Sequence, residues 1–146
     1  MQVKNILAGK PIKVFCTEKN VPSCVAFKKM LENNVGVLPV MEDDKLVGII
    51  SERDALKICI STIDGNVQHK VSDLMTSGPL FTCSPEDHIE SLMSTMTNKK
   101  IRHIPVIEDD KVIGIVSIGD LIKALLDAAT NETTLLKEYI QGSYPA

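Results

Sequence analysis

The chain of 146 residues contains one segment twice. Residues 35–54 align with residues 101–120 at a constant offset of 66, and ten of the twenty aligned positions are identical. Six further positions exchange one aliphatic residue or methionine for another. A repeat of this kind constrains the fold more than any other feature, because both copies are expected to adopt the same local structure.

The two units extend beyond the aligned segments. "VKNIL" at 3–7 resembles "VSDLM" at 71–75, and the sequence between the units carries an Asp-Gly turn signal. We assign residues 3–63 to the first repeat, 64–70 to a linker, 71–129 to the second repeat and 130–146 to a C-terminal helix or tail. Because each unit is small for independent stability, we expect the two to pack into one body with pseudo-twofold symmetry.

Each repeat carries both helical and strand periodicity. Ser84 is the expected N-cap, and Pro85 the first residue, of an amphipathic helix that runs through Met96. "IPVI", the polar turn "EDDK" and "VIGIVS" then predict a hairpin of buried strands. Asp120 is expected to begin a second amphipathic helix. The sequence thus predicts an α+β fold in which each repeat is strand, helix, strand, strand, helix.

Composition excludes several classes of protein. No apolar run approaches the length of a membrane span and no signal-peptide core is present, so we expect a cytoplasmic protein without a membrane anchor. The net charge is −3 and the lysines are scattered, which disfavours a nucleic-acid partner. The cysteines lack metal-ligand or redox spacing, and we expect buried, unreactive thiols at Cys16, Cys24, Cys59 and Cys83.

The sequence carries no mark of a catalytic or metal site. His69, His88 and His103 have no spacing typical of a metal site or a catalytic triad, and no serine or cysteine lies in a recognisable nucleophile motif. Asp54 and Asp120 are paired by the repeat, yet neither is marked as a general acid or base. We therefore predict a protein that is not an enzyme and holds no metal.

Four aligned positions change chemical character between the repeats. They lie just before the central strand and in the turn after the hairpin, and both arginines of the chain are among them. A cleft lining can differ between two halves that share one core, so we interpret these positions as facing a cavity. The pairs are Gly36/Arg102, Val37/His103, Glu52/Ile118 and Arg53/Gly119.

Each hairpin ends in the spacing G-x-x-S-x-x-D, with Ser51 and Asp54 in one copy and Ser117 and Asp120 in the other. A hydroxyl at a strand end and a carboxylate at the start of the next helix suit a polyol, and free N–H groups at the helix start attract an anion. The same spacing also fits plain helix caps, with each Asp as N-cap. The duplication favours ligand binding, and both interpretations stay open.

The two copies of this pattern resemble the cystathionine β-synthase (CBS) domain, and the tandem pair resembles a Bateman module. "SERD" at 51–54, "IRHIPV" at 101–106 and "EYIQGSY" at 138–144 are similar to forms found in stand-alone CBS-pair proteins. The resemblance implies two β-α-β-β-α units packed through their sheets. It also implies clefts that bind an adenosine-containing ligand, most often AMP, ADP or ATP, with NAD and S-adenosylmethionine as alternatives.

The resemblance assigns roles to individual polar residues. Asp54 and Asp120 would hold the ribose hydroxyls, while Ser51 and Ser117 would lie near ribose and phosphate. The basic residues that would meet phosphates are Arg53, Arg102 and His103. Because their counterparts Gly119, Gly36 and Val37 are not basic, we expect the two clefts to differ in affinity.

The resemblance also implies where the adenine would lie, against backbone and apolar groups at the strand starts. For one cleft these residues are Lys10, Ile12, Val35, Gly36 and Val37. For the other they are Pro79, Leu80, Ile101, Arg102 and His103.

The resemblance further implies a homodimer of two modules that acts in trans on an unidentified regulated protein. The alternative is a structural dimerisation module with vestigial clefts. The C-terminal segment bears on this choice, because one face of a helix ended by Gly142 contains Leu135, Leu136, Tyr139 and Ile140. This face either folds back on the core of its own chain or contacts a second copy or another partner.

Overall fold

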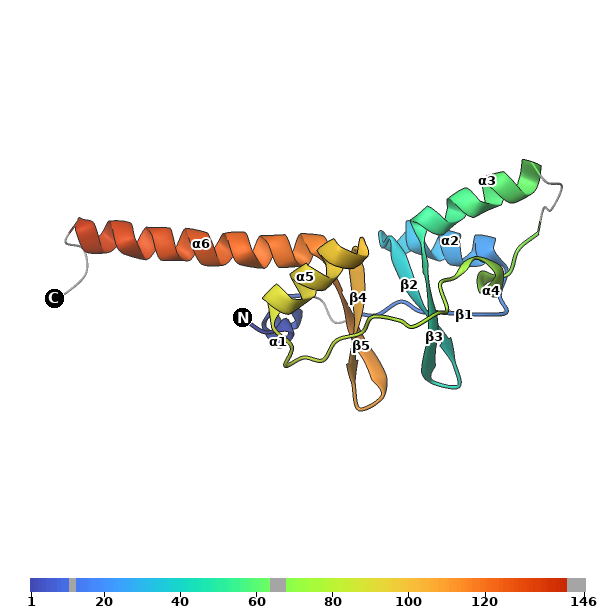
Figure 1. Cartoon of the computed structure of the whole chain (residues 1–146), viewed down its shortest axis with the longest axis horizontal. Helices are drawn as coiled ribbons and strands as arrows, with labels where there is room; N and C mark the ends of the chain where they lie inside the picture. The colour runs from blue at the N-terminus through green and yellow to red at the C-terminus, as the bar shows by residue number, and fades with distance from the viewer. Residues whose placement is uncertain (11–12, 64–67, 142–146) are drawn as a thin grey trace.

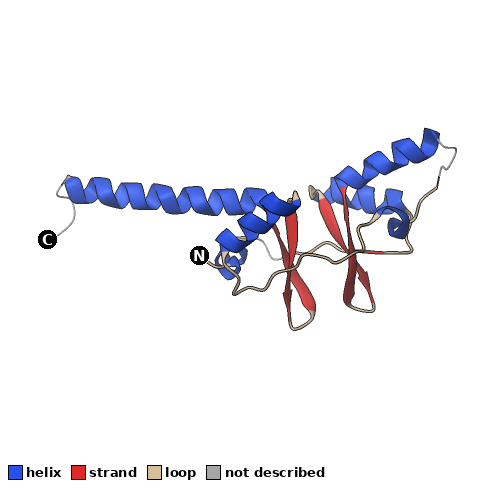
Figure 2. Ribbon diagram, viewed as in Figure 1, coloured by secondary structure: helices blue, strands red, loops and turns tan. Residues whose placement is uncertain are grey.

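The computed structural model describes residues 1–10, 13–63 and 68–141, and its architecture is α+β, as predicted (Figures 1 and 2). The first repeat consists of β1 (Thr17–Glu18), α2 (Ser23–Asn33), β2 (Val37–Glu42), β3 (Lys45–Ser51), a 3-10 turn (Glu52–Asp54) and α3 (Ala55–Ile63). The second consists of α5 (Ile89–Lys99), β4 (His103–Glu108), β5 (Lys111–Ser117) and α6 (Ile118–Ile140). Each assigned repeat begins with a short helix, α1 (Val3–Ala8) or α4 (Val71–Leu74).

The two predicted hairpins are confirmed and have the same register. β2 pairs with β3, and β4 with β5, both antiparallel and both with an irregularity after the valine of the shared Pro-Val pair, Val40 or Val106. Each turn has two aspartates with positive φ, Asp43 and Asp44 in the first repeat and Asp109 and Asp110 in the second. Left-handed residues in a two-residue loop match the right-handed twist of the strands, which explains why the "EDDK" turn occurs in both copies.

The first strand of each repeat is short. In the first repeat, Thr17 pairs with Val40, so that β1 joins a three-stranded sheet. In the second repeat, Cys83 makes a single parallel bridge to Val106, and the described residues there form a two-stranded sheet. The first strand expected for the second repeat is therefore reduced to one residue. The two sheets meet where β3 contacts β5.

Each short helix packs into the core of the other repeat. Val3 of α1 is fully buried among residues of the second repeat, whereas Val71 of α4 is fully buried among residues of the first. Gly48 and Gly114 permit this exchange, because a Cβ there would lie 2.7 Å from Met75 Sδ and 2.8 Å from Leu7 Cδ2, respectively. Each core thus contains a helix from the other repeat, although the sequence places that helix at the start of its own repeat.

Two helix starts differ from the sequence prediction. The helix predicted from Ser84 begins at Ile89, because the Asp87 carboxylate accepts the Ser84 N–H at 2.8 Å and holds the intervening residues in a turn. The helix predicted from Asp120 begins at Ile118. Its N-cap is Ser117, and Asp120 is the third helical residue.

The C-terminal segment continues α6 and does not fold back on the core. No proline interrupts the helix, which runs unbroken to Ile140 and extends away from the body of the molecule (Figure 1). Leu121 is fully buried, whereas the side chains of Leu136 and Ile140 are 57% and 81% exposed. The fold-back interpretation is therefore wrong, and the predicted end at Gly142 lies outside the described residues.

The cysteines divide into two kinds. Burial raises the pKa of the Cys83 thiol to about 12, which agrees with an unreactive core residue. Cys16 is half-buried, but Cys24 and Cys59 lie on exposed surfaces of α2 and α3, so the expectation that all four are buried is wrong. Both exposed thiols belong to helical faces that turn away from the cores.

Candidate functional site

Each hairpin leads into a helix through a capping box. In the second repeat, the Asp120 N–H donates to Ser117 Oγ at 3.1 Å, and Asp120 Oδ2 accepts the Ser117 N–H at 2.9 Å. In the first repeat, Asp54 Oδ2 accepts the Ser51 N–H at 2.8 Å. The serine is therefore the cap and the aspartate the third helical residue, a variant of the S-x-x-E box. This local structure fixes both carboxylates beside the ends of β3 and β5.

Two clefts lie beside these capping boxes. The Ser117 cleft has a volume of about 790 Å³, and the Ser51 cleft one of about 310 Å³. Their linings are related residue by residue at the offset of 66, as Lys10/Thr76, Lys13/Pro79, Val14/Leu80, Phe15/Phe81, Asn34/Lys100, Val35/Ile101, Gly36/Arg102, Val37/His103, Ile115/Ile49 and Ser117/Ser51. Gly36, Val37 and His103 line both clefts and form the wall between them.

Most residues predicted from the sequence line one of these clefts. The Ser51 cleft brings together Ser51, Arg53, Asp54, Pro79, Leu80, Ile101, Arg102 and His103. The Ser117 cleft brings together Lys10, Val35, Gly36, Val37, His103 and Ser117. Within the described part of the chain, Ile118, Gly119 and Asp120 are absent from both linings, and Ile12 lies outside the described residues.

We predicted that the four positions that differ between the repeats face a cavity. All four residues of the first repeat line a cleft, but only Arg102 and His103 of the second repeat do. Glu52 and Arg53 line the Ser51 cleft, whereas Ile118 and Gly119 line neither described cleft. Ile118 packs against the core of the second repeat instead. The physical reason is that α6 begins directly after β5, so Ile118 and Gly119 belong to the first turn of that helix. Glu52 and Arg53 instead belong to a 3-10 turn that separates β3 from α3.

Several lining residues were missed by sequence reasoning. Phe15 and Phe81 occupy equivalent places, and the ammonium groups of Lys13 and Lys99 lie 5.2 and 5.6 Å from their ring centres. Extending the repeat alignment upstream to "KPIKVF" and "TSGPLF" would have paired these two rings, the one identity in that stretch. Asn34 and Lys100 are left-handed C-caps of α2 and α5, which project into the clefts from the helix ends.

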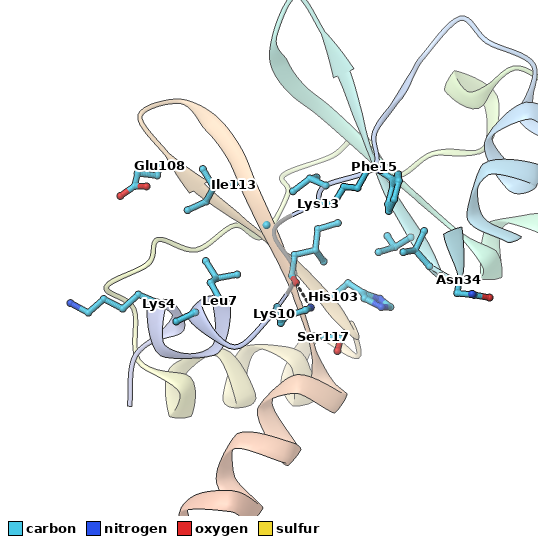
Figure 3. Close-up of a pocket in the computed structure, with 17 residues that line it drawn as sticks. Lys4, Leu7, Lys10, Lys13, Phe15, Asn34, His103, Glu108, Ile113 and Ser117 are labelled. Atoms are coloured by element: carbon cyan, nitrogen blue, oxygen red, sulfur yellow. Dashed lines mark hydrogen bonds between the residues drawn. The ribbon is translucent and has the colours of Figure 1, made fainter. Parts of the chain in front are cut away.

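The basic residues are more evenly divided than the hairpin sequences suggest. The Ser51 cleft contains Arg53, Lys100 and Arg102, and the Ser117 cleft contains Lys4, Lys10 and Lys13. The lysines come from α1 and the segment after it, outside the aligned repeat. Figure 3 shows Lys10 near the middle of the Ser117 cleft, with Lys4 and Glu108 toward one end and Phe15 and Asn34 toward the other.

The two carboxylates have different cation partners. Lys10 Nζ lies 2.7 Å from Asp120 Oδ2. It also donates to the Ile115 carbonyl at 3.0 Å, the hydrogen bond drawn as a dashed line at Lys10 in Figure 3. Lys57 Nζ, on the first turns of α3, lies 3.0 Å from Asp54 Oδ1. Burial alone would raise the pKa of Asp120, but the hydrogen bonds from Lys10 and the Ser117 backbone outweigh it and hold the pKa below its ordinary value.

His103 is half-buried and lines both clefts. Burial lowers its pKa, and the lowering prevails over the opposing charges of Asp120 and Glu52. His103 would offer a phosphate a positive charge only in its protonated form, for which the ordinary pKa is about 6.5. It becomes charged at a lower pH.

Comparison with known proteins identifies the family of the chain. The model of the CBS domain matches residues 22–61 and residues 71–127. The chain belongs to the CBS domain family. A CBS domain-containing protein of Arabidopsis thaliana, CBSX3, described as mitochondrial, is 43% identical over 123 residues, which cover 82% of this chain and 60% of the relative. The match thus spans less than two thirds of the plant protein.

Solved CBS pairs share the fold closely. A protein with CBS domains from Burkholderia ambifaria is 32% identical, with a TM-score of 0.79 over 87% of this chain and 95% of that chain. A CBS domain pair in complex with 5′-methylthioadenosine and S-adenosyl-L-methionine is 25% identical, with a TM-score of 0.70 over 88% of this chain and 98% of that chain. The two repeats described above are therefore two CBS domains forming a CBS pair.

Family membership and the structure bear on several predicted properties. Stand-alone CBS pairs are regulatory modules without catalytic activity. No helix among residues 1–10, 13–63 and 68–141 is long and apolar enough to cross a membrane. The same described residues contain no group of three or more potential metal ligands of the His, Cys, Asp or Glu types.

Proposed function

We propose that the chain is a ligand sensor that binds adenosine-containing molecules in the clefts between its two CBS domains. The observation that carries this proposal is the residue-by-residue equivalence of the two linings, in which a serine, an aromatic ring and basic groups recur around each cleft. A structural neighbour binds two adenosine compounds, which supports adenosine as the common chemical class. AMP is the ligand we expect first, with ADP, ATP, NAD and S-adenosylmethionine as alternatives.

The proposed binding mode divides each cleft by chemistry. The purine lies against the apolar lining, Val35 and Phe15 in the Ser117 cleft and Ile101 and Phe81 in the Ser51 cleft. The ribose hydroxyls bind Asp120 or Asp54, and the phosphate binds the basic residues. Aromatic rings and aliphatic side chains accept the face of any purine, so specificity among adenosine ligands comes from the charged part.

The proposal includes action in trans on a regulated protein, in the cytoplasm, by a homodimer. CBS pairs commonly dimerise. In this chain, exposed apolar side chains follow α3 and α6, including Leu56, Ile60, Leu136 and Tyr139. Apolar faces of this extent are typical of contact surfaces between subunits.

The same exposed helices support a second candidate function, a dimerisation or interaction module whose clefts no longer bind ligand. Calorimetric titration of the purified chain with AMP, ATP and S-adenosylmethionine distinguishes the two. Saturable binding of at least one of them, in the micromolar range, is expected for a sensor. A chain that dimerises but binds none of the three supports the interaction module.

A further inference from the structure

We infer that Lys10 is a specificity-determining residue of the Ser117 cleft, and that it makes this cleft prefer adenosine ligands with a 5′-phosphate over phosphate-free ones. This inference rests on the proposed function. It concerns the Lys10 side chain, which occupies the place where a ribose would meet Asp120.

The geometry of Lys10 gives the first step. Its ammonium group lies 2.7 Å from Asp120 Oδ2 and also donates to the Ile115 carbonyl at 3.0 Å. Asp120 Oδ2 accepts the Ser117 N–H as well, at 2.9 Å, so both acceptor positions of this oxygen are occupied. A ribose that binds both carboxylate oxygens through its two hydroxyls must therefore displace Lys10.

The displaced ammonium group determines what kind of ligand the cleft accepts. The Lys10 side chain is 37% exposed, against 52% for Lys57. The cleft around Lys10 has an apolar part, lined by Leu7, Val14 and Ile113, where an ammonium group without its carboxylate partner is less favourable than in water. A 5′-phosphate is attached to the same ribose and lies within the sweep of a flexible four-carbon side chain, so it provides a new partner. A phosphate-free ligand provides none, and a sulfonium ligand adds repulsion.

The Ser51 cleft has no lysine at the position equivalent to Lys10. Thr76 stands at the equivalent position, and its backbone pairs with Ile49 through bonds of 2.8 and 3.0 Å. Asp54 is held instead by Lys57, which is not among the lining residues and whose side chain is 52% exposed. Lys57 also donates to the Leu74 carbonyl. Displacing Lys57 from Asp54 leaves its charge in contact with water, at little cost.

The test is a methyl-detected NMR titration with AMP and with 5′-methylthioadenosine, because the two clefts have separate reporters. Leu7 and Ile113 line the Ser117 cleft alone, and Ile49 and Leu80 the Ser51 cleft alone. The variants are Lys10→Met, which removes the charge, and Lys10→Arg, which keeps it. Lys13→Met is the matched control, since it removes the same charge from the same cleft without touching Asp120.

The inference predicts changes of opposite sign for the two ligands. In Lys10→Met, 5′-methylthioadenosine binds the Ser117 cleft more tightly and AMP more weakly, so that the ratio of their affinities changes by roughly tenfold or more. Lys10→Arg retains the preference for AMP, and the Ser51 reporters respond as in the parent. Lys13→Met weakens AMP alone.

Three results would overturn the inference. An unchanged affinity ratio in a folded Lys10→Met would show that Lys10 does not select ligands, and an equal change in Lys13→Met would reduce its effect to general charge. If the parent chain binds neither ligand at either cleft, the proposed function itself fails and the inference with it. Unchanged far-ultraviolet circular dichroism and an unchanged melting temperature establish that each variant is folded.

Discussion

The Ser51 and Ser117 clefts share one motif and differ in what closes them. Each begins at the end of a hairpin with the same register and a Ser–Asp capping box. Beside the Ser51 cleft, the Thr76 backbone pairs with the outer edge of β3. Beside the Ser117 cleft, a lysine side chain contacts the outer edge of β5 instead. The Ser51 cleft, beside the paired backbone, has a volume of about 310 Å³, and the Ser117 cleft, beside the lysine side chain, one of about 790 Å³.

The repeated motif builds two sites but does not make them equal. The residues that differ most, Lys10 and Thr76, come from segments upstream of the aligned region, and each reaches its cleft next to a helix exchanged between the repeats. A difference in ligand choice between two such sites can therefore come from residues outside the motif, such as Lys10, as well as from residues within it, such as Arg102.

The largest effect is expected from removing the carboxylates. Asp54→Ala should weaken AMP binding at the Ser51 cleft by about tenfold to a hundredfold, and Asp120→Ala should do the same at the Ser117 cleft, because each removes charge-assisted contacts to ribose. Calorimetry with AMP measures both. Equal affinity in both variants and in the parent would leave the aspartates as capping residues alone.

The capping boxes add a cost to these variants. Each aspartate accepts a backbone N–H from its serine, so alanine should also reduce the free energy of unfolding by about 0.5–2 kcal/mol. Asp54→Asn and Asp120→Asn keep an acceptor for that bond and serve as controls in urea denaturation. A loss of binding in the asparagine variants with little loss of stability separates ligand contact from capping.

The last helices of the repeats give the second test, since α3 ends at Ile63 and α6 continues to Ile140. If the long apolar face of α6 lies in the dimer interface, Leu136→Lys should weaken dimerisation by roughly tenfold or more, because burying an unpaired charge is unfavourable. Sedimentation equilibrium at micromolar concentration measures it. Thr134→Lys, on the opposite face of the helix, is the matched control. A parent chain that is monomeric would contradict the dimer.

The arginines provide a smaller contrast between the clefts. Arg102→Ala should weaken AMP at the Ser51 cleft by roughly threefold to tenfold and reduce the dependence of binding on salt, because an exposed guanidinium–phosphate contact is screened. Titrations at two salt concentrations check this. Lys111→Ala removes a charge at the turn of the second hairpin, outside the lining of the Ser51 cleft, and should change neither quantity there. An equal effect of both variants would mean that Arg102 acts through net charge.

The features that could be predicted from the sequence are those set by residues close together in the chain. The hairpins, their turns and the Ser–Asp spacing follow from short sequence patterns, and the structure agrees with them. The start of α5 was predicted wrongly. The Asp87 carboxylate accepts the N–H of Ser84, three residues earlier, and this turn competes with a helix that begins at Ser84. The Lys10–Asp120 pair joins residues 110 positions apart, and no periodicity or spacing signals a contact of that kind. The packing of α1 and α4 into the core of the other repeat could not be predicted either, because it also depends on contacts between distant residues.

The smallest effect concerns His103, which lies in the wall between the clefts. Its pKa is lowered in the folded chain, so between the ordinary value of about 6.5 and the lower folded value the unfolded chain binds more protons. Stability should therefore fall as the pH drops below about 6.5. Urea denaturation from about pH 7.5 to about pH 5.5 should show this slope in the parent and a flatter one in His103→Gln. A slope that is unchanged by the substitution would assign the effect to another group.

The most direct test of two unequal adenosine sites is a titration of the parent chain with AMP in which the methyl groups of Ile113 and Leu80 are followed together. Ile113 reports on the Ser117 cleft and Leu80 on the Ser51 cleft. We predict that both signals shift but saturate at different AMP concentrations, with Leu80 saturating first. The Ser51 cleft offers a phosphate the guanidinium groups of Arg53 and Arg102, whereas the basic side chains that line the Ser117 cleft alone are lysines. Signals that saturate together, or do not shift at all, would contradict the account.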